Sequence, residues 1–100
     1  MAKKPATKAE REHMARVATL PCLVCGATAT VHHVTGYADR MGRIARSNWR
    51  VVPLCPLHHM IQHGPRESVE ALGHRGFFNM HGIDLYSVSQ HLMWESVGHD

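Results

Sequence analysis

The chain has 100 residues, enough for one domain, and its two Phe, two Tyr and two Trp provide for only a modest core. It opens on charged residues, holds three cysteines and contains no apolar run long enough to cross a membrane, so we expect a cytoplasmic protein with reduced thiols and no membrane partner. The formal charge of +3 suits an anionic partner, and ten histidines are an unusually large number for this length.

The N-terminal segment predicts a flexible basic tail over residues 1–6, followed by a single domain over residues 7–97. Thr7 and Glu10 have the spacing of a capping box, in which each side chain satisfies a free amide at a helix start. We therefore expect a helix from there to about Thr19, ended by the proline that follows.

Two short strands are predicted next. Ala29–Val34 and Trp49–Leu54 have the β-branched content of strands and should pair in antiparallel fashion. Gly36–Ser47, between them, is polar and basic and is expected to be a wide loop. Pro53 lies near the end of the second strand, which implies an edge position or a strand terminus.

The C-terminal half is expected to be helical, which makes the fold class α+β. A helix should begin at Cys55 and reach His63, with Pro56 tolerated in its first turn because the missing amide would be unpaired there. The further predicted helices are Glu67–Leu72, His74–Met80 closed by Gly82, and Ser87–Trp94 opened by a second capping box at Ser87.

Two pairs of residues have the spacing of zinc ligands. Cys22 and Cys25 form a C-x2-C turn whose thiolates converge, and Cys55 and His58 share one face at the start of the predicted helix. Four such ligands fill a tetrahedron, so we expect a structural zinc. Two other interpretations compete with it: a redox C-x2-C pair, which would need a βαβ context, and separate buried thiols.

Four further histidines predict a second, open site beside the zinc. His59 and His63 have the i, i+4 spacing of one helix face, while His59 is rotated by about 100° from His58. Neighbouring side chains on a strand point to opposite sides, so His32 and His33 should have different roles unless the strand ends there. One can bind a cation and the other can activate water, because neutral imidazole suits both roles near neutral pH.

The pattern resembles that of a known superfamily. Cys22-x2-Cys25, Val31-His32-His33-Val34, Asn48, and Pro53-Leu54-Cys55-Pro56-Leu57-His58-His59 with His63 are similar to the HNH, or ββα-metal, endonucleases. The similarity extends to the Ref-type, RecA-dependent recombination-enhancement nucleases of phages and prophages, from Thr7–His13 to Gly82–Leu85. It implies a small zinc-stabilised, treble-clef-like ββα core with flanking helices.

The resemblance also implies a role for each residue of the second site. His33 would be the general base, and Asn48 would orient the hairpin loop or the metal shell. His32, His59 and His63 would hold one divalent cation, Mg or Mn in preference to Zn or Ni. The implied activity is hydrolysis of DNA phosphodiester bonds to 5′ phosphates and 3′ hydroxyls in phage or prophage recombination, with a RecA filament as a second partner.

Arginines concentrate in one short basic stretch: Arg40, Arg43, Arg46 and Arg50. They would bind the DNA backbone, with an affinity that falls as salt rises and carries little sequence preference. The alternative is an ordinary solvated face.

The alternative function is a non-catalytic zinc module that binds DNA or docks on a RecA filament. It would need the four zinc ligands, but it would leave the surplus of histidines unexplained. Histidines without paired spacing are expected to be structural or superficial, namely His13, His74, His81, His91 and His99. Core positions are expected at Phe77, Phe78, Leu85, Leu92 and Trp94, with Trp49 buried beneath the zinc site.

Overall fold

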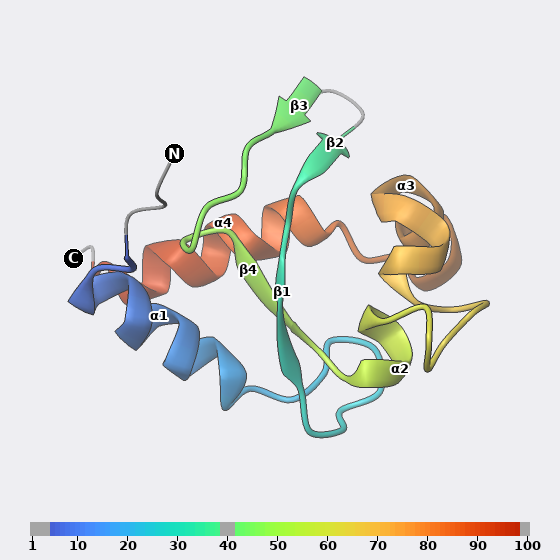
Figure 1. Cartoon of the computed structure of the whole chain (residues 1–100), viewed down its shortest axis with the longest axis horizontal. Coiled ribbons are helices and arrows are strands. Elements are labelled where there is room, and N and C mark those ends of the chain that lie inside the picture. The colour runs from blue at the N-terminus through green and yellow to red at the C-terminus, as the bar shows by residue number, and fades with distance from the viewer. Residues whose placement is uncertain (1–4, 39–41, 99–100) are drawn as a thin grey trace.

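The chain folds around a two-stranded antiparallel sheet that is flanked by helices (Figure 1). The computed structural model describes residues 5–38 and 42–98, and for residues 36–38 and 42–44 it describes the backbone alone. In chain order the elements are α1 Lys8–Ala18, β1 Thr30–His33, β2 Gly36–Ala38, β3 Gly42–Ile44, β4 Val51–Leu54, α2 Pro56–His59, α3 Val69–His81 and α4 Leu85–Ser96. This is the expected α+β class.

Helix α1 begins where the sequence predicts it. Thr7 Oγ1 accepts from the Glu10 amide at 3.1 Å, and the Glu10 carboxylate accepts from the Thr7 amide at 2.8 Å, so both halves of the capping box are present. The helix ends at its C-cap Thr19, as expected. Its buried residues His13 and Val17 lie four positions apart and so share a face, and α1 packs on β1, β4 and α4.

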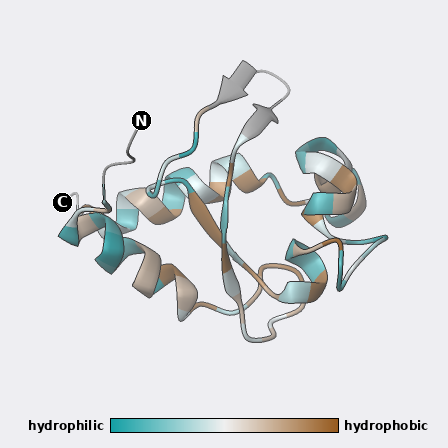
Figure 2. Ribbon diagram, in the orientation of Figure 1, coloured by the Kyte–Doolittle hydropathy of each residue, from teal (hydrophilic) through white to brown (hydrophobic). Residues whose placement is uncertain are grey.

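Strands β1 and β4 form the antiparallel pair that the sequence predicts, with Thr30 opposite Leu54 and His33 opposite Val51. Every residue of β4 is buried, and Figure 2 shows this strand as a hydrophobic band through the middle of the molecule. Pro53 is tolerated because each strand of a two-stranded sheet has a free edge, on which no amide is required.

The prediction of a single wide loop over Gly36–Ser47 is wrong, because β2 and β3 form a second antiparallel pair within it. Gly36 lies opposite Ile44, and Ala38 lies opposite Gly42. Each of these three-residue strands contains a glycine, which is depleted in strands, so the local sequence gives little sign of the pair.

Helix α2 ends at His59 and not at His63 as predicted. Met60 has an extended backbone with φ −108° and ψ 133°, and the amides of His63 and Gly64 bond to its carbonyl at 3.1 and 2.8 Å in a separate turn. A side chain at Gly64 would place its Cβ 1.8 Å from the Leu57 carbonyl oxygen, so this turn is packed directly against α2.

Helices α3 and α4 complete the fold, and their boundaries differ in part from the prediction. The two predicted pieces of α3 are joined through a kink at Gly73, which has φ 71° and ψ 170°, and Gly82 ends the helix in the left-handed conformation as expected. Helix α4 begins at Leu85 and not at Ser87, because Asp84 provides the N-cap. Among the described helices, none combines the length and apolar character needed to cross a bilayer.

The core lies where β4 meets α3 and α4. Its buried members are Cys22, Val34, Val52, Leu54, Cys55, Val69, Phe77 and Leu85, with Leu92 packed against them. Phe78 and Trp94, which were expected in the core, are instead 46% and 58% exposed. Each lies on a helix that buries a different residue, Phe77 on α3 and Leu85 on α4, so apolar character alone does not identify the inward face.

Candidate metal centre and histidine cluster

Three thiols and one imidazole converge where β4 meets α2. Cys22 and Cys25 come from the turn after α1, Cys55 and His58 come from the start of α2, and their ligand atoms all lie within 4.8 Å of one another. The Sγ atoms of Cys25 and Cys55 are 3.6 Å apart, and His58 Nδ1 lies 3.3 Å from Cys55 Sγ and 3.7 Å from Cys22 Sγ. Tetrahedral zinc, with bonds of about 2.3 Å to sulfur and about 2.0 Å to nitrogen, separates its ligand atoms by about 3.5–3.8 Å. The four groups therefore fit a structural zinc, as their spacing predicts.

The turn that presents the first two thiols is shaped by backbone hydrogen bonds. Gly26 adopts φ +77°, and its amide donates to the Cys22 carbonyl at 2.9 Å. Burial raises the pKa of the Cys22 thiol, but hydrogen bonds led by that from the backbone of Cys55 outweigh it and lower the pKa to about 6. Burial raises the pKa of Cys55, and the charge of Cys22 adds to the increase. Neighbouring thiolates repel one another, so a dication is what allows all three to ionise together.

His58 is supported by a second imidazole that the sequence did not single out. The His58 side chain is buried, and its ring meets that of His81 edge to face with centroids 5.4 Å apart. His81 Nε2 donates to the Glu67 carbonyl at 3.0 Å, and this hydrogen bond fixes the His81 ring against the His58 ring. Of the other histidines without paired spacing, His91 is exposed on α4, and His99 lies outside the described residues.

A second group of imidazoles begins with His32 on β1 and His59 on α2, whose rings meet edge to face with centroids 4.8 Å apart. Thr30 Oγ1 donates its one proton to the Leu54 carbonyl at 2.7 Å, so it accepts from His59 Nδ1, which is 2.8 Å away. Neutral His59 is therefore protonated on Nδ1 and keeps a lone pair on Nε2. Burial lowers the pKa of both imidazoles, that of His32 to about 3, which favours the neutral form that binds cations.

The third member of this group is His74 of α3, which we expected to be structural or superficial. Its Nε2 lies 3.4 Å from His32 Nε2, and burial lowers its pKa as well. His63 is exposed and lies beyond the end of α2, so it does not share a helix face with His59 as the i, i+4 spacing predicts. Because 42 positions separate His74 from His32, no local spacing could have identified it.

His33 has a different set of contacts, as the alternation along a strand predicts. Its Nε2 donates to Asn48 Oδ1 at 3.0 Å, which leaves the lone pair of the neutral ring on Nδ1. Hydrogen bonds from the backbone and side chain of Thr7, and then one from Asn48, lower the pKa of Glu10. The observed hydrogen bond of the Asn48 side chain is therefore the one to the imidazole of β1.

The basic stretch is only partly described. Arg40 lies outside the described residues, and Arg43 is described only by its backbone in β3. Arg50 lies over the ring of Tyr86 with its Cζ 4.8 Å from the ring centroid, and its Nη1 is buried without a hydrogen-bond partner. Arg46 is exposed. Among the described arginine side chains of this stretch, Arg46 is therefore the more exposed.

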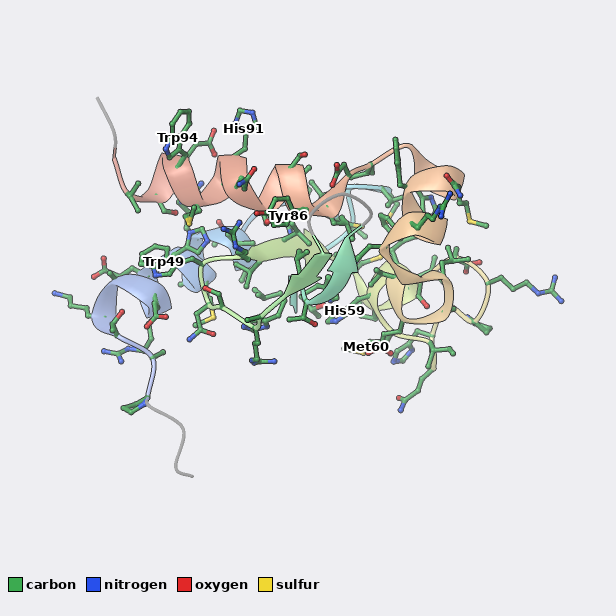
Figure 3. All side chains as sticks on the ribbon, turned by 90° about the horizontal axis from the view of Figure 1, so that it is seen from above. Trp49, His59, Met60, Tyr86, His91 and Trp94 are labelled. Atoms are coloured by element: carbon green, nitrogen blue, oxygen red, sulfur yellow. The ribbon has the colours of Figure 1, made fainter. Side chains whose placement is uncertain are left out.

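Trp49 lies against α1 and not beneath the zinc ligands as expected. Its ring centroid is 5.2 Å from that of His13, and Figure 3 shows it beside α1, at a distance from His59. His13 Nε2 donates to the Trp49 carbonyl at 3.1 Å, and its other ring nitrogen accepts from the Ser96 hydroxyl, which in turn accepts from Arg16 Nε at 2.8 Å. His13 is thus a structural residue, as expected.

Comparison of the chain with protein-family models, with curated proteins and with solved structures finds no match. The chemistry of the site therefore has to be argued from the arrangement of its own residues.

Proposed function

We propose that this protein is a metal-dependent DNA endonuclease of the HNH type, with His33 as the general base. The observation that carries the proposal is the hydrogen bond from His33 Nε2 to Asn48 Oδ1, which leaves Nδ1 to accept a proton. The residue before it in the strand, His32, belongs to the group of imidazoles with His59 and His74. A proton acceptor and a candidate cation ligand therefore occupy the last two positions of β1.

The arrangement suits hydrolysis of a phosphodiester. His33 would take a proton from water as the water oxygen bonds to phosphorus and the bond to the 3′ oxygen breaks. The 3′ oxygen leaves with a proton from solvent, and the products are a 5′ phosphate and a 3′ hydroxyl. Asn48 would keep the imidazole aligned with the proton that it removes. A divalent cation held by the neighbouring imidazoles would stabilise the negative charge that develops on the phosphate and the leaving oxygen.

The order of elements supports a ββα-metal core. The turn with Cys22 and Cys25 precedes β1. Cys55 and His58 follow β4, and α2 begins at Pro56, between these two residues. A metal bound there would fix the sheet to the helix that carries His59. The HNH resemblance of these segments supports the same interpretation.

The substrate would be a polyanion, because the chain has a formal charge of +3 and a pI of about 9.0. Exposed Arg46 would contact the phosphate backbone, so DNA affinity should fall as salt rises. A RecA filament as a second partner, and a role in phage or prophage recombination, rest on the resemblance alone.

A plasmid-nicking assay tests the proposal. We expect His33→Ala to reduce cleavage by about 10²- to 10⁴-fold, the usual contribution of a general base, while zinc content and thermal unfolding stay close to those of the wild type. The matched control is His91→Ala, which removes an exposed imidazole from α4 and should cleave normally.

The assay is run with Mg²⁺, Mn²⁺, Ni²⁺ and Zn²⁺, with and without a RecA filament. Undiminished cleavage by His33→Ala would show that the base is assigned wrongly. A zinc-loaded wild type that binds DNA but cuts it under none of these conditions would favour the alternative, a non-catalytic zinc module.

A further inference from the structure

We propose that Cys25 and Cys55 form a thiol-oxidation site, at which a peroxide joins the two residues in a disulfide so that the four-ligand site can no longer hold a metal. The site is built from the turn after α1 and from the residue that precedes α2. This inference does not depend on the proposed function, because it concerns the thiols and not the histidines of β1.

Exposure decides which thiol meets the oxidant. Cys25 is exposed, whereas Cys22 and Cys55 are each only 4% exposed. Oxidation of a cysteine follows the thiolate character and the accessibility of its sulfur. A peroxide that arrives from solution therefore reaches Cys25 before the other two thiols.

The contact between Cys25 and Cys55 decides which thiol completes the reaction. Their Sγ atoms lie 3.6 Å apart, although 30 positions separate the two residues in the chain. The Cys22 sulfur is engaged within its own turn, where it accepts from the Val24 amide at 3.4 Å. A disulfide needs its two sulfurs at about 2 Å, and rotation of the exposed Cys25 side chain can supply this closure. Cys55 is therefore the partner that we expect.

The chemistry balances with hydrogen peroxide as the oxidant. The Cys25 thiolate bonds to one peroxide oxygen, the O–O bond breaks, and hydroxide leaves, so that Cys25 becomes a sulfenic acid. The Cys55 thiolate then bonds to the Cys25 sulfur, and the S–O bond breaks with loss of a second hydroxide. The two sulfurs together lose the two electrons that the peroxide gains.

The disulfide would change both the metal site and the core. Only Cys22 and His58 would remain as ligands, two fewer than the four that a structural zinc requires. Cys22 and Cys55 also belong to the buried cluster that contains Phe77. Loss of the metal should therefore loosen the packing around these residues, and a dithiol reductant with added zinc should restore it.

The test adds hydrogen peroxide to zinc-loaded, full-length protein and follows the released zinc with a chromophoric chelator. Free thiols are then blocked, the protein is digested with trypsin, and the peptides are identified by mass spectrometry. Cleavage after Lys and Arg leaves Cys22 and Cys25 in the peptide 17–40 and Cys55 in the peptide 51–66. We expect a cross-link between the two peptides, located at Cys25 by fragmentation, that appears at the rate at which zinc is released.

Two matched variants replace one thiol by another zinc ligand. Cys25→His keeps four ligands but loses the exposed thiol, so it should release zinc at least about tenfold more slowly than the wild type. Cys22→His keeps both Cys25 and Cys55, so it should cross-link and release zinc about as fast as the wild type. The zinc content of each variant is measured before oxidation. If a variant holds no zinc, the cross-link in the wild type decides alone.

A disulfide between Cys22 and Cys25, which leaves the two peptides separate, would overturn the inference, and so would a cross-link from Cys22 to Cys55. Zinc loss without any cross-link, or retention of zinc in excess peroxide, would overturn it as well. The same holds if zinc-loaded Cys25→His releases its metal as fast as the wild type.

Discussion

His13 shows how one buried residue can be assigned a protonation state from its contacts. The Trp49 carbonyl can only accept, so His13 Nε2 carries the proton, and the Ser96 hydroxyl then donates to Nδ1. Arg16 Nε donates to the same hydroxyl at 2.8 Å. A second proton on His13 would turn the Ser96 hydroxyl from a donor into an acceptor and would place a buried positive charge beside Arg16, so this environment favours the neutral imidazole.

We predict that His13 makes the fold sensitive to acid. Burial lowers its pKa from 6.5, the hydrogen bond to Trp49 opposes this, and the charge of Arg16 adds to the decrease. The unfolded chain therefore binds the proton at a higher pH than the folded one, and the stability due to neutral His13 is present above pH 6.5 and lost as the pH falls through the lowered pKa. Urea unfolding of His13→Gln should show a smaller decrease of the unfolding free energy between about pH 7 and pH 5 than the wild type shows.

The control for this prediction is His91→Gln, because His91 is exposed on α4 and should leave the acid dependence unchanged. His13→Gln should also cost about 1–3 kcal/mol at neutral pH, since it disturbs buried hydrogen bonds. Equal acid dependence in the wild type and His13→Gln would show that other groups cause it.

At the scale of elements, α4 offers a direct test of where a helix begins. The Asp84 carboxylate accepts from the amides of Tyr86 and Ser87 at 3.1 and 3.2 Å and from the Ser87 hydroxyl at 3.2 Å. We predict that Asp84→Ala lowers the unfolding free energy by about 1 kcal/mol, the usual cost of a lost N-cap, while Ser87→Ala costs less. Chemical denaturation of both variants measures the difference. A larger loss of unfolding free energy in Ser87→Ala than in Asp84→Ala would show that Ser87 is the N-cap, as the sequence analysis predicted.

The sequence predicted those helix boundaries that are set by residues within a few positions of the boundary. The capping box at Thr7 and the C-terminal Gly82 act within a few residues of themselves, so both boundaries are visible in the sequence. The end of α2 is not, because it depends on packing of the turn at Gly64 against the Leu57 carbonyl. The start of α4 was misplaced for a different reason: its cap, Asp84, acts on amides two and three positions further on, and the sequence analysis chose Ser87 instead.

The candidate sites divide in the same way. All four residues of the candidate zinc site were predicted, because the two members of each pair lie three positions apart within one turn. His32 and His59 could be placed together because the paired strands and the helix after them are predictable. His74 could not, because it comes from a helix whose packing depends on side chains far from it in the chain. The prediction for His63 was wrong because two residues four positions apart share a face only within a helix, and α2 ends at His59.

In the molecule as a whole, two cysteines of the candidate zinc site are part of the core. Cys22 and Cys55 belong to the same buried cluster as Phe77 and Leu85, which come from α3 and α4. Helix α2 carries a candidate zinc ligand at His58, and the next residue, His59, has its ring against that of His32. A metal bound by Cys22, Cys25, Cys55 and His58 would therefore fix β1 and α2, which carry His32 and His59. The buried core cluster contains no histidine, so a cation bound by His32 or His59 would not be needed to hold the core together.

Because the four-ligand site is joined to the core and the histidines are not, removal of a metal should have different effects at the two places. Zinc contributes on the order of 10 kcal/mol to the folding of small zinc domains, which is comparable with the roughly 5–15 kcal/mol stability of a whole domain. Stripping zinc with a chelator, or making Cys55→Ser, should therefore abolish the cooperative thermal transition and most of the helical circular dichroism. His59→Ala should keep one zinc and a cooperative transition, because it removes a half-buried side chain outside the core cluster. A zinc-free protein that still melts cooperatively would show that the apolar contacts suffice alone, and the histidine cluster would then be positioned by the sheet and helices without help from the thiols.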